Sequence, residues 1–152
     1  MDDIDRKIAK IIQSDGQSSS AKIAAAVGVS VSTANERVRR LTSSGIVKAW
    51  RAVLEPQKVD ANLCALILVD VGYEGEDETM KKLAGYPQIQ EIHHISGAHS
   101  YLLKIRVADT TALQDFLHNS VKPLAAITAT ESMIVLETLK ETTELVIGET
   151  SK

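Results

Sequence analysis

The side chains best suited to chemistry are hydroxyl, acidic and guanidinium groups gathered in VSVSTANERVRRL, residues 29–41. A helix at 100° per residue places the polar and the apolar members of this run on separate faces. The polar face holds Thr33, Glu36, Arg37 and Arg40, and the apolar face holds Ala34, Val38 and Leu41. Guanidinium groups bind guanine edges or phosphates, and hydroxyls bond to either. The pattern is typical of a helix that enters the major groove, and also of a solvated basic face in a three-helix bundle.

Two short helices are predicted before this segment, and their packing would determine which face of it is exposed. Apolar residues at Ile4, Ile8, Ile11 and Ile12 predict a first helix ending near Gly16. Ser19 or Ser20 can cap a second helix that ends at Gly28, and Ser30 can cap the third. A helix, a tight turn that contains glycine and a second helix with one polar face together form a helix-turn-helix. The predicted DNA-binding residues are Ser32, Thr33, Glu36, Arg37, Arg39, Arg40, Lys48 and Arg51.

Charge divides unevenly along the chain. Residues 1–55 hold nine Lys and Arg against six Asp and Glu, whereas residues 56–152 hold eight against fourteen. The net charge of −3 therefore hides a basic N-terminal third. This asymmetry favours a DNA-reading module joined to a module that does not touch DNA.

The remaining residues predict an α+β arrangement. The run IVKAWRAVLEP, residues 46–56, predicts a strand or small hairpin. Further strands are expected at 63–71, 89–95, 101–107 and 129–139, with helices at 77–84 and 110–121. The order βαββαβ is that of a ferredoxin-like domain. We therefore expect a helix-turn-helix domain over 1–50, a strand and linker over 51–61, and a βαββαβ effector-binding and oligomerisation domain over 62–152.

Nothing in the chain predicts an active site or a metal centre. His93 and His94 are adjacent on a strand and point to opposite faces, so one ion cannot readily bind both. Cys64 lies in an apolar run and is interpreted as a small buried hydrophobe. No secretory signal or membrane-spanning run is evident, so we expect a cytoplasmic protein that does not enter membranes. Because no pattern of catalytic or metal-binding residues is evident, we also expect a protein that needs no cofactor and is not an enzyme.

The stretches DIDRKIAKIIQSDGQSS and AAAVGVSVSTANERVRRLTSSGIVKAW resemble the DNA-binding domain of the Lrp/AsnC (feast/famine) regulators. The stretches VLEPQKVDANL, HHISGAHSYLLKIRV and ESMIVLETLKE resemble the linker and the C-terminal RAM-type domain of that family. The resemblance implies a winged-type helix-turn-helix, transcriptional regulation, homodimers built through the C-terminal sheets and often octamers. It also implies an amino-acid effector between dimers, near Ser96, Gly97, Ala98, His99, Ser100, Tyr101, Met133, Ile134 and Val135.

Two positions depart from the family pattern. The loop after Ser96 lacks the usual acidic residues, so an amino acid's ammonium group would need other acceptors, such as Asp70, Glu91 or Glu131. Weak or altered amino-acid binding is the favoured interpretation. Val31 stands where many members carry proline. Valine is compatible with the start of a helix, although its backbone is not pre-set for one as that of proline is.

Three alternatives stay open at this point. The chain could be an architectural protein that wraps DNA without an effector, or a metabolic enzyme with a ferredoxin-like domain. The loop over residues 96–101 could also be a simple hairpin turn at a subunit contact.

Overall fold

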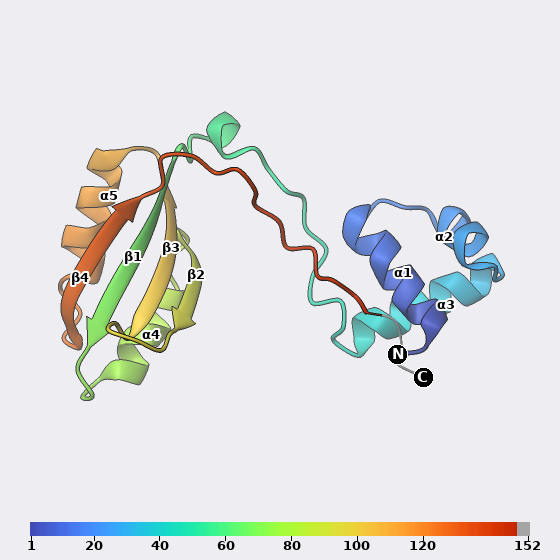
Figure 1. Ribbon diagram of the computed structural model, residues 1–152, viewed down its shortest axis with the longest axis horizontal. Helices are drawn as coiled ribbons and strands as arrows, with labels where there is room; N and C mark the ends of the chain where they lie inside the picture. The colour runs from blue at the N-terminus through green and yellow to red at the C-terminus, as the bar shows by residue number, and fades with distance from the viewer. Residues whose placement is uncertain (149–152) are drawn as a thin grey trace. The chain divides into compact units, whose positions relative to one another are not determined.

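The computed structural model describes residues 1–148 and divides the chain into two compact units (Figure 1). The first unit comprises Met1–Val53 together with the C-terminal residues from Lys140 onward. The second unit comprises Leu54–Leu139. Residues 149–152, which belong to the predicted C-terminal domain, lie outside the described residues.

The first unit is built from three helices that bury a small apolar core. They are α1 (Asp3–Ser14), α2 (Ser20–Val27) and α3 (Val31–Ser43). Ile8 and Ala34 are fully buried and Leu41 is nearly so, which places the predicted apolar face of α3 against α1 and α2. Asp2 caps α1 in a reciprocal capping box with Asp5, and this fixes where α1 begins.

The turn between α2 and α3 follows the predicted chemistry. Gly28 ends α2 with a φ of 73°, a left-handed conformation in which only glycine is unstrained. The Ser30 hydroxyl then accepts a hydrogen bond of 3.1 Å from the Thr33 N–H and caps α3. The helix-turn-helix predicted from these residues is confirmed.

The strand predicted at residues 46–56 is wrong. The chain from Ile46 to Glu55 has no regular secondary structure and is followed by a single 3₁₀ turn, Pro56–Val59. Strand propensity needs a neighbouring strand to pair the backbone N–H and C=O groups, and among the described residues this segment has none.

The second unit is a four-stranded antiparallel sheet with helices on one side (Figure 1). Its elements are β1 (Leu63–Val71), α4 (Glu76–Ala84), β2 (Ile89–His94), β3 (Tyr101–Val107), α5 (Thr110–Phe116) and β4 (Ile127–Ile134). A π-helical turn, Leu117–Val121, extends α5. The strand order β2-β3-β1-β4 confirms the predicted ferredoxin-like βαββαβ fold. The last strand ends at Ile134, however, and not at Leu139 as predicted.

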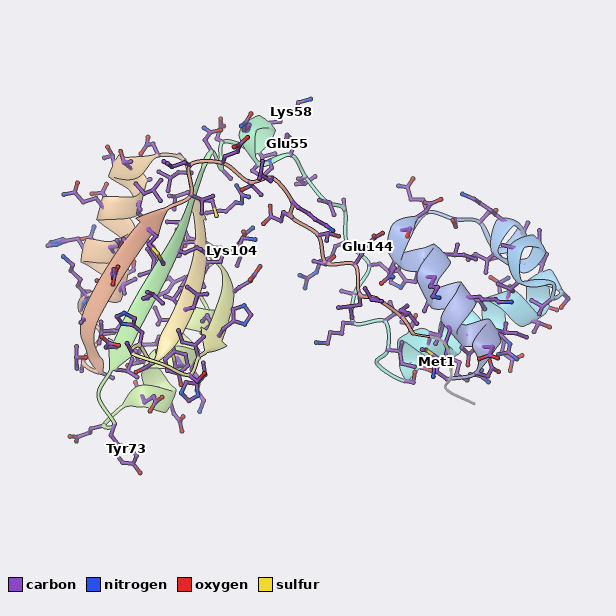
Figure 2. The ribbon with its side chains drawn as sticks, in the orientation of Figure 1. Met1, Glu55, Lys58, Tyr73, Lys104 and Glu144 are labelled. Atoms are coloured by element: carbon purple, nitrogen blue, oxygen red, sulfur yellow. The ribbon has the colours of Figure 1, made fainter. Side chains whose placement is uncertain are left out.

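The two faces of this sheet differ in what covers them. Ile67 of β1, Leu103 of β3 and Phe116 of α5 pack in the core between the sheet and its helices. Residues of the other face alternate with these, and we call that surface the open face. Its central members are Leu66, Leu68, Leu102, Lys104, Glu131 and Met133, as the register of β1 with β3 and β4 requires. Lys104, labelled in Figure 2, marks this face on β3.

The C-terminal segment of the first unit is attached to α1. The Gln13 side-chain amide donates to the Leu145 carbonyl at 2.9 Å, and its oxygen accepts from the Leu145 N–H at 3.2 Å. One guanidinium nitrogen of Arg6 donates to the Gly148 carbonyl at 3.1 Å. Gln13 therefore binds the backbone of this segment as a neighbouring strand would, through one donor and one acceptor.

Replacing Gln13 with alanine is expected to release the C-terminal segment from α1. The Leu145 amide loses its only acceptor among the described residues and should exchange with solvent much faster, while amides in the α1 core stay protected. Hydrogen exchange resolved to single amides measures this effect. Gln13→Glu is the matched control, because it keeps the acceptor oxygen and should retain part of the protection. Equal exchange at Leu145 in the wild type and in Gln13→Ala would contradict the attachment.

Candidate nucleic-acid interface and effector site

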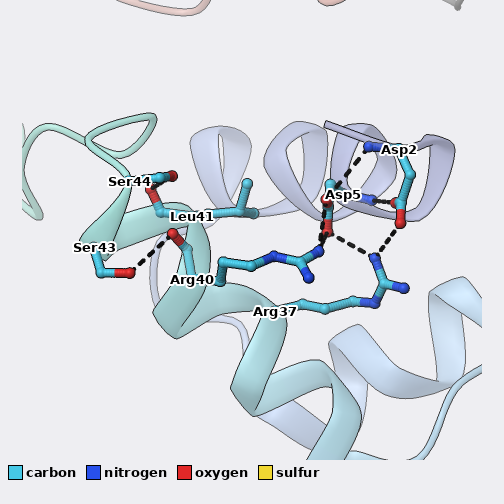
Figure 3. Close-up of polar contacts among 7 residues, drawn as sticks. All are labelled: Asp2, Asp5, Arg37, Arg40, Leu41, Ser43 and Ser44. Atoms are coloured by element: carbon cyan, nitrogen blue, oxygen red, sulfur yellow. Dashed lines mark hydrogen bonds and ion pairs between the residues drawn. The ribbon is translucent and has the colours of Figure 1, made fainter.

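Arg37 and Arg40 of α3 are joined to the beginning of α1 by a network of ion pairs (Figure 3). Arg37 Nη1 lies 2.7 Å from Asp2 Oδ2 and 2.8 Å from Asp5 Oδ1. Arg40 Nη2 lies 3.0 and 2.9 Å from the two oxygens of Asp5. The Asp5 side chain is only 6% exposed, whereas that of Arg37 is 20% and that of Arg40 is 56% exposed.

The buried carboxylate of Asp5 stays ionised because of these partners. Burial by itself raises the pKa of Asp5, but hydrogen bonds from Arg37, the Asp2 backbone and Arg40 outweigh it and leave the pKa below its usual value. The hydrogen bond from Arg37 also lowers the pKa of Asp2. The same contact raises the pKa of Arg37, so both partners are charged near neutral pH.

Hydroxyl groups gather at the beginning of α3. The Ser30 hydroxyl lies 2.9 Å from that of Ser32 and 2.8 Å from that of Thr33. Ser32 is exposed and Thr33 is partly buried. The beginning of α3 therefore presents hydroxyls and the positive end of a helix dipole, which together suit a phosphate or a base edge.

The predicted DNA-binding cations fall into two groups. Arg37 and Arg40 bind the acids of α1, and Arg37 is mostly covered. Arg39, Lys48 and Arg51 are exposed and have no acidic partner among residues 1–148. The sequence pattern did not predict this division, and the only local signal for it is the spacing of Asp2 and Asp5, which is that of a helix cap. The pairing depends on how α1 crosses α3.

The predicted effector turn lies between β2 and β3. Ser96, Gly97 and Ala98 are exposed, and Gly97 has a φ of 130°, which favours glycine. Ser100 is already engaged with β1, because its N–H donates to the Val69 carbonyl at 3.1 Å and its hydroxyl accepts from the Val71 N–H at 3.4 Å. The turn is thus anchored at Ser100 and free at Gly97.

His99 lies between two carboxylates. Its Nδ1 is 3.2 Å from Asp70 Oδ1 and its Nε2 is 3.6 Å from Glu131 Oε2. Asp70 belongs to β1 and Glu131 to β4, so residues distant in sequence converge beside the turn. Glu91, the third predicted acceptor, pairs instead with His93 and Lys104, and hydrogen bonds from these two side chains lower its pKa.

The other predicted effector residues point in different directions. The Tyr101 hydroxyl donates to Glu76 Oε1 at 2.7 Å, and its ring stacks on His94 with centroids 4.7 Å apart. That hydrogen bond raises the pKa of Tyr101. Met133 lies on the open face opposite Leu66, whereas Ile134 pairs with the buried Ala65 and faces the helices. Val135 follows the strand and donates to the Cys64 carbonyl. Within one chain these residues do not form a single pocket.

Neither of the two surface hollows described in the second unit reaches the turn. One is lined by Lys122 and β4 residues 127–130, and the other mainly by α5 with Ile134. No group of three or more potential metal ligands occurs among residues 1–148. No helix in that range is long and apolar enough to cross a membrane.

The fold defines a class of protein, a helix-turn-helix unit joined to an α+β unit with a four-stranded antiparallel sheet. Residues 1–48 match the winged helix-turn-helix DNA-binding family, and residues 64–145 match the Lrp/AsnC ligand binding domain. The chain belongs to the Lrp/AsnC family of DNA-binding transcriptional regulators, as the sequence predicted.

Relatives and solved structures agree over nearly the full length. The chain is 37% identical to the HTH-type transcriptional regulator FL11 of Pyrococcus horikoshii over 147 residues, covering 97% of each chain. It is 33% identical to the leucine-responsive regulatory protein of Escherichia coli over 153 residues, covering 97% of this chain and 92% of the relative. A transcriptional regulator of Neisseria meningitidis, solved in complex with L-Met, superposes with a TM-score of 0.91 at 25% identity, covering 96% of both chains.

Replacing Arg37 with methionine is expected to destabilise the first unit measurably, because the poorly exposed Asp5 and its neighbour Asp2 lose their shared cation. Arg40→Met is the matched control. Arg40 is more than half exposed and leaves Arg37 in place on Asp5, so this change should cost about 1 kcal/mol or less. Urea unfolding of both variants measures the difference. A larger loss for Arg40→Met than for Arg37→Met would contradict the assigned network.

Proposed function

We propose that this regulator is a homodimer whose affinity for duplex DNA is changed by an amino acid or a related small metabolite. The observation that carries this proposal is the match of residues 64–145 to a ligand-binding family in a chain whose residues 1–48 form a DNA-binding unit. A relative of the same fold is solved with L-Met, which supports an amino acid as the effector. The relatives of this chain named above are transcriptional regulators. We therefore infer that this chain also acts by binding and not by catalysis.

Duplex DNA is proposed to contact α3 and the basic segment that follows it. Ser32, Thr33, Glu36, Arg39 and Arg40 lie on or beside the exposed side of α3, with Lys48 and Arg51 further along the chain. The exposed cations suit phosphates, which hold a protein in register on the duplex. Arg37 is proposed to act mainly by holding α3 in place, since its guanidinium is occupied by Asp2 and Asp5.

The open face of the sheet is proposed as the dimer contact. Helices cover only one side of the sheet, which leaves Leu66, Leu68 and Leu102 half-buried and Met133 exposed in the single chain. Apolar surface of this kind is stabilised by burial against a second sheet. A higher assembly such as an octamer would bring further copies together.

The effector is proposed to bind at the turn over residues 96–101, with a second copy completing the site. The turn lies beside the end of β1 at Val69, whereas Met133 pairs with Leu66 three residues away along that strand. One small ligand is therefore poorly placed to touch both groups within one chain, at roughly 3.3 Å per residue. Contact between copies would supply the missing side. The free backbone at Gly97 suits a carboxylate, and Asp70 and Glu131 are the nearest candidate acceptors for an ammonium group.

Replacing Leu68 with glutamate is expected to weaken the dimer, because a charge would be placed in the middle of the apolar contact. Light scattering and sedimentation of the full chain over a range of concentrations measure the effect. Gln114→Glu is the control, since it makes the same change of charge on an exposed position of α5. A dimer of unchanged affinity in a folded Leu68→Glu variant would place the interface elsewhere.

Calorimetric titration of the full chain with the twenty amino acids tests the effector, followed by DNA-binding titrations with and without each ligand that binds. We expect at least one amino acid to bind and to change DNA affinity, with binding lost in Gly97→Val because a branched side chain is strained at a φ of 130°. Binding that survives Gly97→Val and Ser100→Ala would move the site away from the turn. Tight DNA binding that no amino acid alters would instead favour an architectural protein without an effector.

A further inference from the structure

The exposed surface of α3 carries few polar side chains that are free of intramolecular contacts. Asn35 is hydrogen bonded to Ser20 of α2, and Arg37 and Arg40 bind Asp2 and Asp5. Thr42 and Ser43 donate to backbone carbonyls of their own helix. The side chains of Glu36 and Arg39 are exposed and make no hydrogen bond or ion pair with any residue of 1–148.

The contacts of its neighbours show which way Glu36 faces. Arg37 is turned toward α1 by Asp2 and Asp5, and Ala34 and Leu41 are buried against the other helices. At 100° per residue, the side of the helix away from these groups holds Ser32, Asn35, Glu36, Arg39 and Ser43, with Arg39 nearest its centre and Glu36 toward one edge. Glu36 therefore lies midway along the length of the outward surface of α3, one turn after Ser32.

A free carboxylate at this position is chemically unusual for a surface that binds DNA. Phosphates repel it, so it weakens binding wherever it faces the backbone. Arg40, four residues away, is drawn off to Asp5, so this cation does not neutralise Glu36. The groups in the major groove that satisfy a carboxylate are base amino groups, and the characteristic partner is the N4 amino group of cytosine. Thymine presents an acceptor oxygen at the same place, which would repel it.

We propose that Glu36 is a specificity-determining residue that accepts a hydrogen bond from a cytosine amino group in each half-site. This inference rests on the proposed contact of α3 with duplex DNA. The carboxylate contributes discrimination more than affinity, because the C·G pair satisfies it and a pair with an acceptor at that position does not. Arg39, beside it on the helix, supplies a free cation for the adjoining phosphate or guanine.

The test uses the full chain and a duplex selected by the wild-type protein from a randomised library. Affinity is then measured for every single base-pair change in that duplex, for the wild type, Glu36→Ala, Glu36→Gln and the control Glu55→Gln. Glu55 is exposed and lies outside α3, so its replacement makes the same change of charge elsewhere. Circular dichroism and unfolding midpoints confirm that the exposed substitutions leave the fold unchanged.

The wild type is expected to lose roughly 10- to 100-fold in affinity when one particular C·G pair is changed to T·A. Glu36→Ala should lose most of this discrimination at that position alone, and Glu36→Gln should shift the preference toward adenine, the base that glutamine binds. Glu55→Gln should keep the wild-type pattern. An unchanged pattern in Glu36→Ala overturns the assignment of Glu36 and leaves the regulator function intact. A wild type that selects no sequence overturns sequence-specific recognition itself.

Discussion

The DNA-binding unit depends on the buried carboxylate of Asp5. It lies where α1 begins, next to the Asp2 cap, and it binds Arg37 and Arg40 from successive turns of α3. A charged group at 6% exposure is unfavourable unless its partners are present, so α1 and α3 are stable chiefly in the one arrangement that pairs them. The small apolar core around Ile8 and Leu41 supplies burial but less directional constraint.

This arrangement gives neighbouring arginines different roles. Arg37 is mostly covered and positions the helix, Arg40 is shared between Asp5 and solvent, and Arg39 is exposed without an acidic partner among the described residues. The α3 helix therefore carries more positive charge than it can present to a phosphate, because part of that charge is paired with the acids of α1. Its outward surface presents hydroxyls, one free acid and one free cation, a combination that suits discrimination between base pairs better than attraction to any duplex.

In the second unit, the constraint is a sheet with helices on one side only. The alternation of side chains along β1 places Ile67 in the core and Leu66 and Leu68 on the open face. The same alternation separates Met133 from Ile134 and carries Glu131 toward His99. The turn proposed to bind the effector is thus bordered by charged residues at one end of an apolar surface, an arrangement consistent with the proposed ligand site completed by a second copy.

The sequence by itself determined the local structure, because caps, glycine turns and hydrophobic periodicity act over a few residues. Ser30, Gly28 and the apolar run Leu63–Val71 predicted their elements correctly. Only the tertiary structure decided which polar groups meet. The pairing of Asp5 with Arg37 and of His99 with Asp70 joins residues about 30 positions apart, and no local pattern encodes such contacts. The strand predicted at 46–56 failed for the related reason that a strand forms only where a neighbour is available to pair with it.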